Sequence, residues 1–132
     1  MFYEFGQNNS GGSFIEDVKR GISHYVIIEA DSVDEANDRA EKIGLYFNGC
    51  DSGKDCRCCG DRWYTQYDNK EGTKHPEHYG KRLGEDFKDN YGGMMVWDDA
   101  SHLFVHYKDG TIAGYKQKSE GFEFLEEFVA PI

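Results

Sequence analysis

The fold is decided by residues 25–44, which read YVIIEADSVDEANDRAEKIG. The first four residues are apolar on both faces and rich in β-branched side chains, which predicts a central strand within Gly21 to Ala30. Ser32 and Glu35 then stand three residues apart, the spacing of a helix N-cap and its capping box. Apolar residues recur at helical spacing up to Gly44, so a helix with a narrow, small-residue face follows the strand. They are Val33, Ala36, Ala40 and Ile43.

Further strands are expected on both sides of this unit. They are Phe2 to Phe5 at a sheet edge, Leu45 to Phe47, Arg62 to Tyr67 and Met94 to Trp97. Lys108-Asp109-Gly110 predicts a hairpin between Leu103 to Tyr107 and Thr111 to Tyr115, with Asp109-Gly110 as a two-residue turn. Gly121 to Val129 is amphipathic and fits a helix or a strand. The elements together predict an α+β fold, a mainly antiparallel sheet with one principal helix packed across a face.

A single domain spanning residues 1–132 is expected, because a chain of 132 residues can bury a core without disulfides. Residues from about 68–89 are polar and are interrupted by glycine and proline, which predicts a long loop with a short helix near Lys81 to Lys88. A loop of that length in a compact domain usually has a function or is disordered.

The chain is strongly acidic, with a formal net charge of -10. This charge argues against direct binding to nucleic acid or to an anionic membrane, since both attract basic surfaces. The N-terminus has neither the basic nor the apolar region of a signal peptide, and no apolar run approaches the roughly 20 residues of a membrane span. A cytoplasmic location is therefore expected, where thiols are normally reduced.

Three of the four cysteines lie within residues 55–63, which read DCRCCGDRW. Cys56 and Cys59, followed by Gly60, have the spacing of a metal-binding knuckle, and zinc is the candidate cofactor. Cys50 is the candidate third ligand. His75 and His78, in an H-x-x-H pattern, are candidates for the remaining positions.

Cys58 is set aside as surplus, because neighbouring residues rarely both reach one ion. Free thiols are an alternative to a zinc site. A redox dithiol is a weaker alternative, because no buried strand leads into a helix that begins at Cys56.

A ligand-binding site is a second hypothesis for the same region. Arg62 and Trp63, with Arg57 nearby, have the chemistry to stack on a nucleotide base and to pair with its phosphate. The glycine-rich loop that contains Asn8 and Asn9 would supply amides that recognise a polar ligand. In the alternative, Trp63 anchors the core and Arg62 pairs with an acidic residue.

No catalytic residues are assigned. His24, His102 and His106 are interpreted as structural, and the acidic pairs Asp98-Asp99 and Glu126-Glu127 as solvent-facing. Catalytic partners meet in space and not in sequence, so spacing alone names no triad.

Two segments resemble a family of small proteins encoded by tailed bacteriophages. They are residues 3–14, YEFGQNNSGGSF, and residues 55–63. The likeness also covers Tyr25 to Gly44 and His106 to Gly110, and so most of the chain outside the loop at about 68–89. The family has no established activity, so the resemblance implies a viral origin and, by class, an action on host machinery or immunity.

The leading hypothesis is a bacteriophage accessory protein that binds a host target in the host cytoplasm without catalysis. Its most concrete form is a counter-defence protein that sequesters a nucleotide signal between the Asn8-Asn9 loop and Arg62-Trp63. One alternative is an acidic protein–protein inhibitor that mimics nucleic acid. Another is a small metal-dependent hydrolase at the cysteine–histidine region. The oligomeric state stays open.

Overall fold

The computed structural model describes residues 1–8, 12, 14–66, 71–78, 81–83, 102–118 and 121–129. Within them, a five-stranded sheet has the order β1-β2-β5-β6-β7, and β3 and β4 form a separate hairpin. The sheet strands are β1 (Phe2–Gly6), β2 (Tyr25–Glu29), β5 (His102–His106), β6 (Thr111–Lys118) and β7 (Gly121–Val129). The other elements are the 3₁₀ helix η2 (Val18–Arg20), α1 (Val33–Ile43), α2 (Gly49–Ser52), β3 (Glu77–His78) and β4 (Lys81–Arg82).

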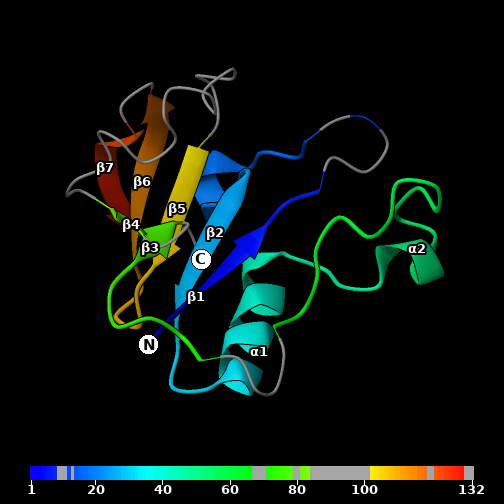
Figure 1. The fold of residues 1–132 in the computed structure, drawn as a ribbon, viewed down its shortest axis with the longest axis horizontal. Coiled ribbons are helices and arrows are strands. Elements are labelled where there is room, and N and C mark those ends of the chain that lie inside the picture. Colours follow the sequence, from blue (N-terminus) through cyan, green and yellow to red (C-terminus); the bar gives the residue numbers. More distant parts are fainter. Residues whose placement is uncertain are drawn as a thin grey trace.

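The sheet is mainly antiparallel, and only β2 and β5 among its neighbouring strands run parallel. Figure 1 shows α1 beside β1 and β2, while α2 lies far from the sheet at the end of extended segments. The predicted α+β class, with one principal helix across a face, is confirmed.

β2 lies inside the sheet, between β1 and β5, as its sequence predicts, although it is shorter than Gly21 to Ala30. Val26 and Ile28 belong to the core under α1, and Ile27 belongs to the core on the other face. All three side chains are at most 1% exposed. Because alternate residues of a strand point to opposite faces, an apolar run without alternation fits a strand covered on both sides.

α1 begins and ends where the sequence predicts. Ser32 Oγ accepts a hydrogen bond from Glu35 N at 3.2 Å, and Gly44 ends the helix with a φ of 130°. Glu35 Oε1 accepts from Asp31 N at 3.3 Å, one residue before the position that a capping box would use. Three small side chains of α1 face the sheet and are buried. They are Val33, Ala36 and Ala40.

The core has one part on each face of the sheet. The part under α1 consists of Tyr3, Phe5, Ile22, Val26, Ile28, Ala30, Val33, Ala36, Ala40, Leu45 and Trp63. The part on the opposite face consists of Phe2, Ile27, Leu103, Val105, Ala113 and Tyr115.

The hairpin of β5 and β6 forms as predicted, but its loop is longer than two residues. Tyr107 N donates to Thr111 O at 2.9 Å, and Gly110 N donates to Tyr107 O at 3.0 Å. Gly110 has a φ of 94°, which favours glycine. The connection is therefore a four-residue turn that ends on a left-handed glycine. Gly121–Val129 is a strand, so the strand alternative for this segment is confirmed.

Two predicted strands are absent from the described residues. Leu45 N donates to Ala40 O at 3.0 Å and so completes the end of α1. Arg62 N and Gln66 N donate to the side chains of Asp55 and Asn37, at 2.8 and 2.9 Å. Both predictions were wrong because these backbone donors are used by a helix end or by side chains instead of a strand ladder.

The long loop predicted at about 68–89 contains the β3–β4 hairpin. Lys81–Arg82 is a strand, so the expected helix near Lys81 to Lys88 does not begin there, and residues 84–88 lie outside the described residues. The strand predicted at Met94 to Trp97 and the pair Asp98-Asp99 also lie outside them.

Candidate functional site

The candidate site lies on a lobe formed by residues 45–63, between α1 and the segment that returns to the sheet. In Figure 1 this lobe contains α2 and extends away from the strands. A buried polar network fixes its base, and the three clustered cysteines lie on its outer turn.

Arg62 is the centre of the buried network. Its Nη1 donates to Gln7 Oε1 at 2.9 Å, and its Nε donates to Tyr46 Oη at 3.1 Å. Asp55 completes the network, with Oδ1 accepting from Tyr46 Oη at 2.8 Å and lying 3.7 Å from Arg62 Nε. The Arg62 and Asp55 side chains are 8% and 0% exposed. A buried ion pair with this many hydrogen bonds holds the lobe against the end of β1.

Gln7 connects this network to the sheet. Its Nε2 donates to Ile15 O at 3.0 Å and Ser23 O at 2.9 Å, while its Oε1 also accepts from Ile15 N at 2.6 Å. Both the amino group and the carbonyl oxygen of the Gln7 side chain are therefore hydrogen-bonded. The lobe is thus hydrogen-bonded to the chain just after β1 and just before β2.

The residues predicted to bind a nucleotide have structural contacts in this lobe. Trp63 is 2% exposed and packs in the core under α1, while Arg62 is 6% exposed. Asn8 Nδ2 donates to Cys59 O at 2.8 Å and Asp61 O at 3.1 Å, so it holds the cysteine turn. Arg57 is exposed, and Asn9 lies outside the described residues. Of the described residues in this set, Arg62 and Trp63 are therefore buried, Asn8 is hydrogen-bonded to the cysteine turn, and Arg57 is exposed.

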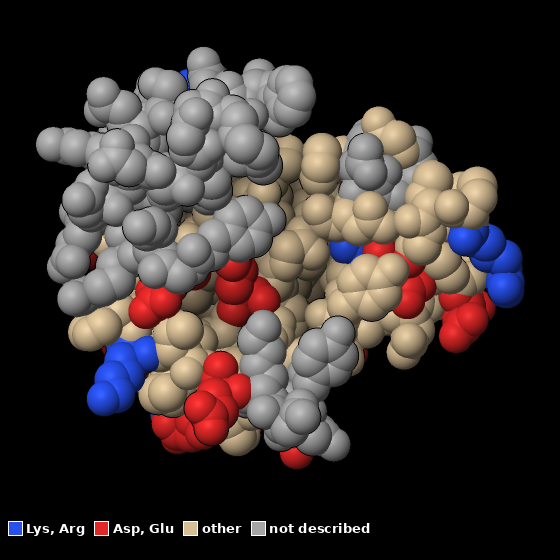
Figure 2. Space-filling model, viewed as in Figure 1, with Lys and Arg blue, Asp and Glu red and all other residues tan. Residues whose placement is uncertain are grey.

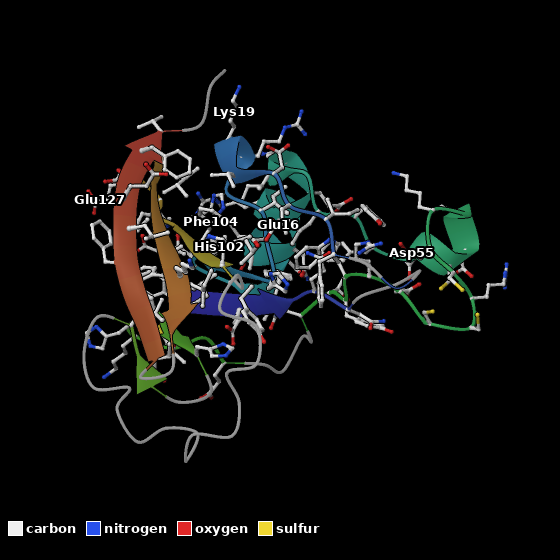
Figure 3. All side chains as sticks on the ribbon, turned by 90° about the horizontal axis from the view of Figure 1, so that it is seen from above. Glu16, Lys19, Asp55, His102, Phe104 and Glu127 are labelled. Atoms are coloured by element: carbon white, nitrogen blue, oxygen red, sulfur yellow. The ribbon has the colours of Figure 1, made fainter. Side chains whose placement is uncertain are left out.

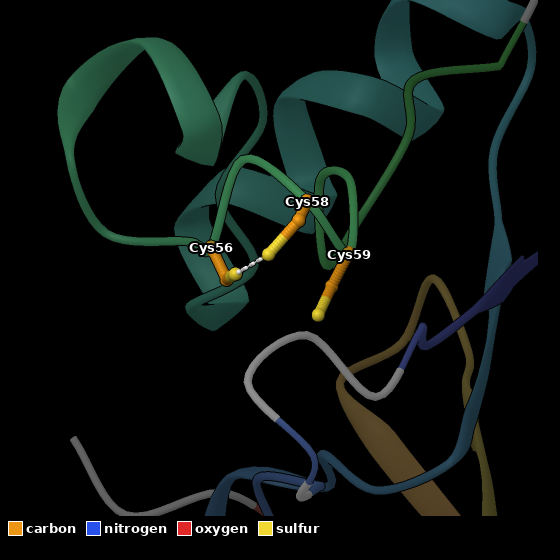
Figure 4. Close-up of side chains that lie close together, drawn as sticks. All are labelled: Cys56, Cys58 and Cys59. Carbon is orange, nitrogen blue, oxygen red and sulfur yellow. Dashed lines mark hydrogen bonds between the residues drawn. The ribbon is translucent and has the colours of Figure 1, made fainter.

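The cysteine turn brings together the Sγ atoms of Cys56, Cys58 and Cys59, all within 4.8 Å of one another. Figure 4 shows the three side chains on one side of the turn. Cys59 N and Gly60 N both donate to Cys56 O, at 3.2 and 3.1 Å. Gly60 has a φ of 88°, so a glycine is favoured where the chain leaves the turn.

The thiols of the turn influence one another. Hydrogen bonds from the Cys58 side chain and backbone, followed by those from Cys59, lower the pKa of Cys56 to about 7. The same contact with Cys56 raises the pKa of Cys58. A thiolate that forms near neutral pH is the form of cysteine that binds metals and attacks electrophiles.

Cys50 does not join this group. Its Sγ donates to Cys56 O at 3.4 Å, and its N donates to Asp61 Oδ1 at 2.9 Å. Desolvation, reinforced by the Asp61 carboxylate, raises the pKa of Cys50 to about 11. Cys50 supports the backbone of the turn, and its thiol stays protonated at neutral pH.

The predicted histidine ligands lie elsewhere. His78 Nδ1 is 2.5 Å from Glu4 Oε2, and its ring packs 4.3 Å from that of Tyr25. His75 is exposed, and its carbonyl accepts from Thr73 Oγ1 at 2.6 Å. The H-x-x-H pattern made both candidate ligands, but the chain crosses back to the β1 edge of the sheet before it reaches them. The observed cluster of thiols therefore differs from the predicted ligand set. It contains Cys58, and it lacks Cys50 and both histidines.

The three thiols could hold one metal ion. A tetrahedral zinc ion has Zn–S bonds of about 2.3 Å, which places two ligand sulfurs about 3.8 Å apart. Sulfurs that lie within 4.8 Å of one another reach this spacing by small side-chain movements. The ion would be exposed, because Cys58 and Cys59 are both at the surface.

A second polar cluster was not predicted from the sequence. Glu16 Oε1 accepts from Ser23 Oγ at 2.9 Å and lies 3.7 Å from Nδ1 of both His24 and His102. Figure 3 shows Glu16 next to His102, with Asp55 farther away in the lobe. The two histidines directly precede Tyr25 and Leu103, which are paired partners in β2 and β5. The sequence does not show this pairing of the two strands, so it could not show that the histidines are neighbours.

The chain belongs to a family defined by a domain of unknown function, DUF7296, whose model matches residues 1–124. Comparisons with curated proteins and with solved structures found no match. None of the helices in the described part of the chain has the length and apolar character needed to span a bilayer.

Proposed function

We propose that this protein is a non-catalytic binding protein that contacts its target through the tip of the cysteine lobe. Cys56, Cys58 and Cys59 would hold one zinc ion there. The observation that carries the proposal is the approach of three sulfurs to within 4.8 Å on an exposed turn.

The position of the thiols favours presentation of a metal over a purely structural role. Three ligands within four consecutive residues close only a very short loop, so metal binding would constrain little of the chain. The base of the lobe has its own support in the contacts of Arg62, Asp55 and Gln7. A metal at the tip would therefore be available for contact with a partner.

Three protein ligands leave one position of a tetrahedral zinc ion open. Water would occupy it in the free protein, and a thiolate or imidazole of the target would replace that water on binding. Such a bridge needs no catalytic base. Sequestration of a nucleotide has less support, because Arg62 and Trp63 are buried.

Cobalt substitution tests this proposal. We expect one Co²⁺ per chain, with a thiolate-to-cobalt absorption band, and a visible spectrum that changes when imidazole is added, because imidazole enters the open position. Cys59→Ser should weaken binding, whereas Cys50→Ser, which changes a cysteine outside the group, should not. A spectrum that imidazole leaves unchanged would show a closed site and contradict the proposed bridge.

A second candidate function is an acidic inhibitor that occupies a basic groove of a host protein. Asp34, Asp38 and Glu41 are exposed on α1 at helical spacing, and the net charge is -10. Figure 2 shows acidic side chains in several groups across one face of the molecule. Affinity for a basic protein that falls steeply as salt rises would support this candidate, whereas salt-independent affinity would exclude it.

A bacteriophage origin and a site of action in the host cytoplasm belong to the same proposal. They are supported by the likeness of residues 3–14 and 55–63 to proteins of tailed phages. Both would be tested by locating the protein in infected cells with an antibody. Detection in the cytoplasmic fraction during infection is the expected result, and detection only in purified virions would contradict it.

A further inference from the structure

Cys56 and Cys58 are in direct contact through their thiols. Their Sγ atoms are 2.8 Å apart, and the dashed line in Figure 4 marks this contact. Two sulfurs bound to one zinc ion would be about 3.8 Å apart, whereas a disulfide bond is about 2.05 Å long. The two sulfurs thus lie closer together than metal ligands, and Cys58 is exposed to reagents in solvent.

We propose that Cys56 and Cys58 form a reversible disulfide by exchange with a low-molecular-weight disulfide, and that this bond switches metal binding off. The regulatory part rests on the proposed function, since it needs a metal at the same thiols. The exchange itself needs only the two cysteines.

The exchange proceeds in two balanced steps. The Cys56 thiolate attacks one sulfur of the reagent disulfide, so a mixed disulfide forms on Cys56 and one reagent thiolate leaves. The Cys58 thiol then loses its proton to solvent, and its thiolate attacks Cys56 Sγ. The Cys56–Cys58 bond forms, and the second reagent thiolate leaves. Two protein thiols are oxidised, the reagent disulfide is reduced, and the two released thiolates take up two protons from solvent.

Oxidation would remove two of the three metal ligands at once. Cys59 alone would remain, and a single thiolate does not hold a zinc ion tightly. An external thiol would reverse the change: one thiolate attacks the disulfide and forms a mixed disulfide, and a second thiolate releases it, so both cysteines are reduced and the reagent disulfide is formed again. The contacts of Arg62 with Gln7 and Asp55 involve none of the three sulfurs, so the lobe should stay folded.

Peptide mapping tests the exchange on metal-free protein, because trypsin cleaves after Lys54, Arg57 and Arg62. Cys56 is then on peptide 55–57, and Cys58 and Cys59 are on peptide 58–62. After treatment with oxidised glutathione, quenching and digestion, we expect the two peptides to be joined. The link should persist in Cys59→Ser. In Cys58→Ser it should fall by at least about tenfold, and Cys56 should keep the glutathione.

The opposite pattern would overturn the proposal. A link that persists in Cys58→Ser and is lost in Cys59→Ser would assign the disulfide to Cys59. Stable glutathione on Cys56 of the unmodified protein would show that Cys58 does not resolve the mixed disulfide. Because the assay contains no metal, it tests the disulfide exchange independently of zinc binding. Either proposal could fail without contradicting the other. Zinc loaded before glutathione should slow the linkage, and an unchanged rate would contradict the regulatory part.

Discussion

Arg62 Nη1 donates a hydrogen bond to Gln7 Oε1 at 2.9 Å, across a separation of 55 residues in the chain. The bond is buried and joins the cysteine lobe to the end of β1. The same guanidinium group pairs with the fully buried Asp55. Arg62, together with the bonds from Asn8 to Cys59 and Asp61, thus links the cysteine turn to the end of β1.

Arg62→Ala is expected to destabilise the protein by about 3–5 kcal/mol, because it leaves the Asp55 carboxylate buried without its cation. Urea denaturation followed by tryptophan fluorescence would measure the loss. Arg57→Ala is the matched control, since Arg57 is exposed in the same lobe, and its midpoint should change little. Equal midpoints for the two variants would contradict the assigned role of Arg62.

Gly49→Ala should also weaken the lobe. A Cβ atom on Gly49 would lie 1.8 Å from Asp55 Oδ2, so the carboxylate that anchors Arg62 would have to move. We expect a loss of about 1–3 kcal/mol in the free energy of unfolding. Gly6→Ala is the control, because the added Cβ would lie 3.9 Å from Tyr25 Cδ1, which is an ordinary van der Waals contact. A Gly49 variant as stable as the Gly6 variant would show that Asp55 has more space than the structure gives it.

The reactivity of Cys56 should rise with pH around neutrality. Its pKa is lowered to about 7, chiefly by the hydrogen bond from the Cys58 side chain, so the thiolate forms as pH rises through that value. Alkylation by iodoacetamide, mapped on peptide 55–57, should reach half of its maximal rate near this pH. Cys58→Ala, which removes the side-chain donor, should move the midpoint upward, toward the value of an ordinary thiol. An unchanged midpoint would mean that Cys58 does not stabilise the thiolate.

His106 should make stability depend on pH. Burial lowers its pKa from 6.5 to about 4, and its Nε2 is 2.8 Å from Gly21 O. Between these two pH values the unfolded chain binds a proton that the folded protein does not bind, so stability falls as pH falls. The slope is at most about 1.4 kcal/mol per pH unit. Urea midpoints at pH 7 and 5 should differ less in His106→Gln than in the unmodified protein, and an equal difference would contradict this account.

The strand–helix unit and the hairpin were predictable because short-range patterns specify them. The apolar run of β2, the cap at Ser32 and the glycines at positions 44 and 110 act through neighbours in the chain. The missing strand at Arg62 to Tyr67 was not predictable in this way. Its backbone donors bond to Asp55 and Asn37, and no local pattern indicates that these side chains compete with a strand ladder.

The cysteine cluster was predicted in part. Cys56 and Cys59 were recognised from their spacing, and the structure brings them together. Cys58 was set aside because adjacent residues rarely share an ion. In the structure, hydrogen bonds to Cys56 O close a tight turn, and the sulfur of Cys58 lies against that of Cys56. Ligands contributed by distant residues depend on topology, so spacing could not show that His78 would pair with Glu4 instead.

Arg62 and Trp63 show another limit of sequence analysis. A cation beside an aromatic ring suits both a nucleotide site and a buried anchor, and composition alone does not separate the two. The burial of the two side chains decides between a ligand site and a buried anchor. That burial depends on the packing of Trp63 with residues of β1, β2 and α1.

The most direct test of the central claim is the zinc affinity of Cys58→Ser compared with that of Cys50→Ser, measured by competition with a chromogenic chelator. If Cys56, Cys58 and Cys59 hold the ion, the Cys58 variant should lose more than the roughly 10–100-fold that removal of an outer-shell partner costs. The Cys50 variant should bind zinc as tightly as the unmodified protein, at one ion per chain. Loss of affinity in the Cys50 variant with normal affinity in the Cys58 variant would contradict the claim.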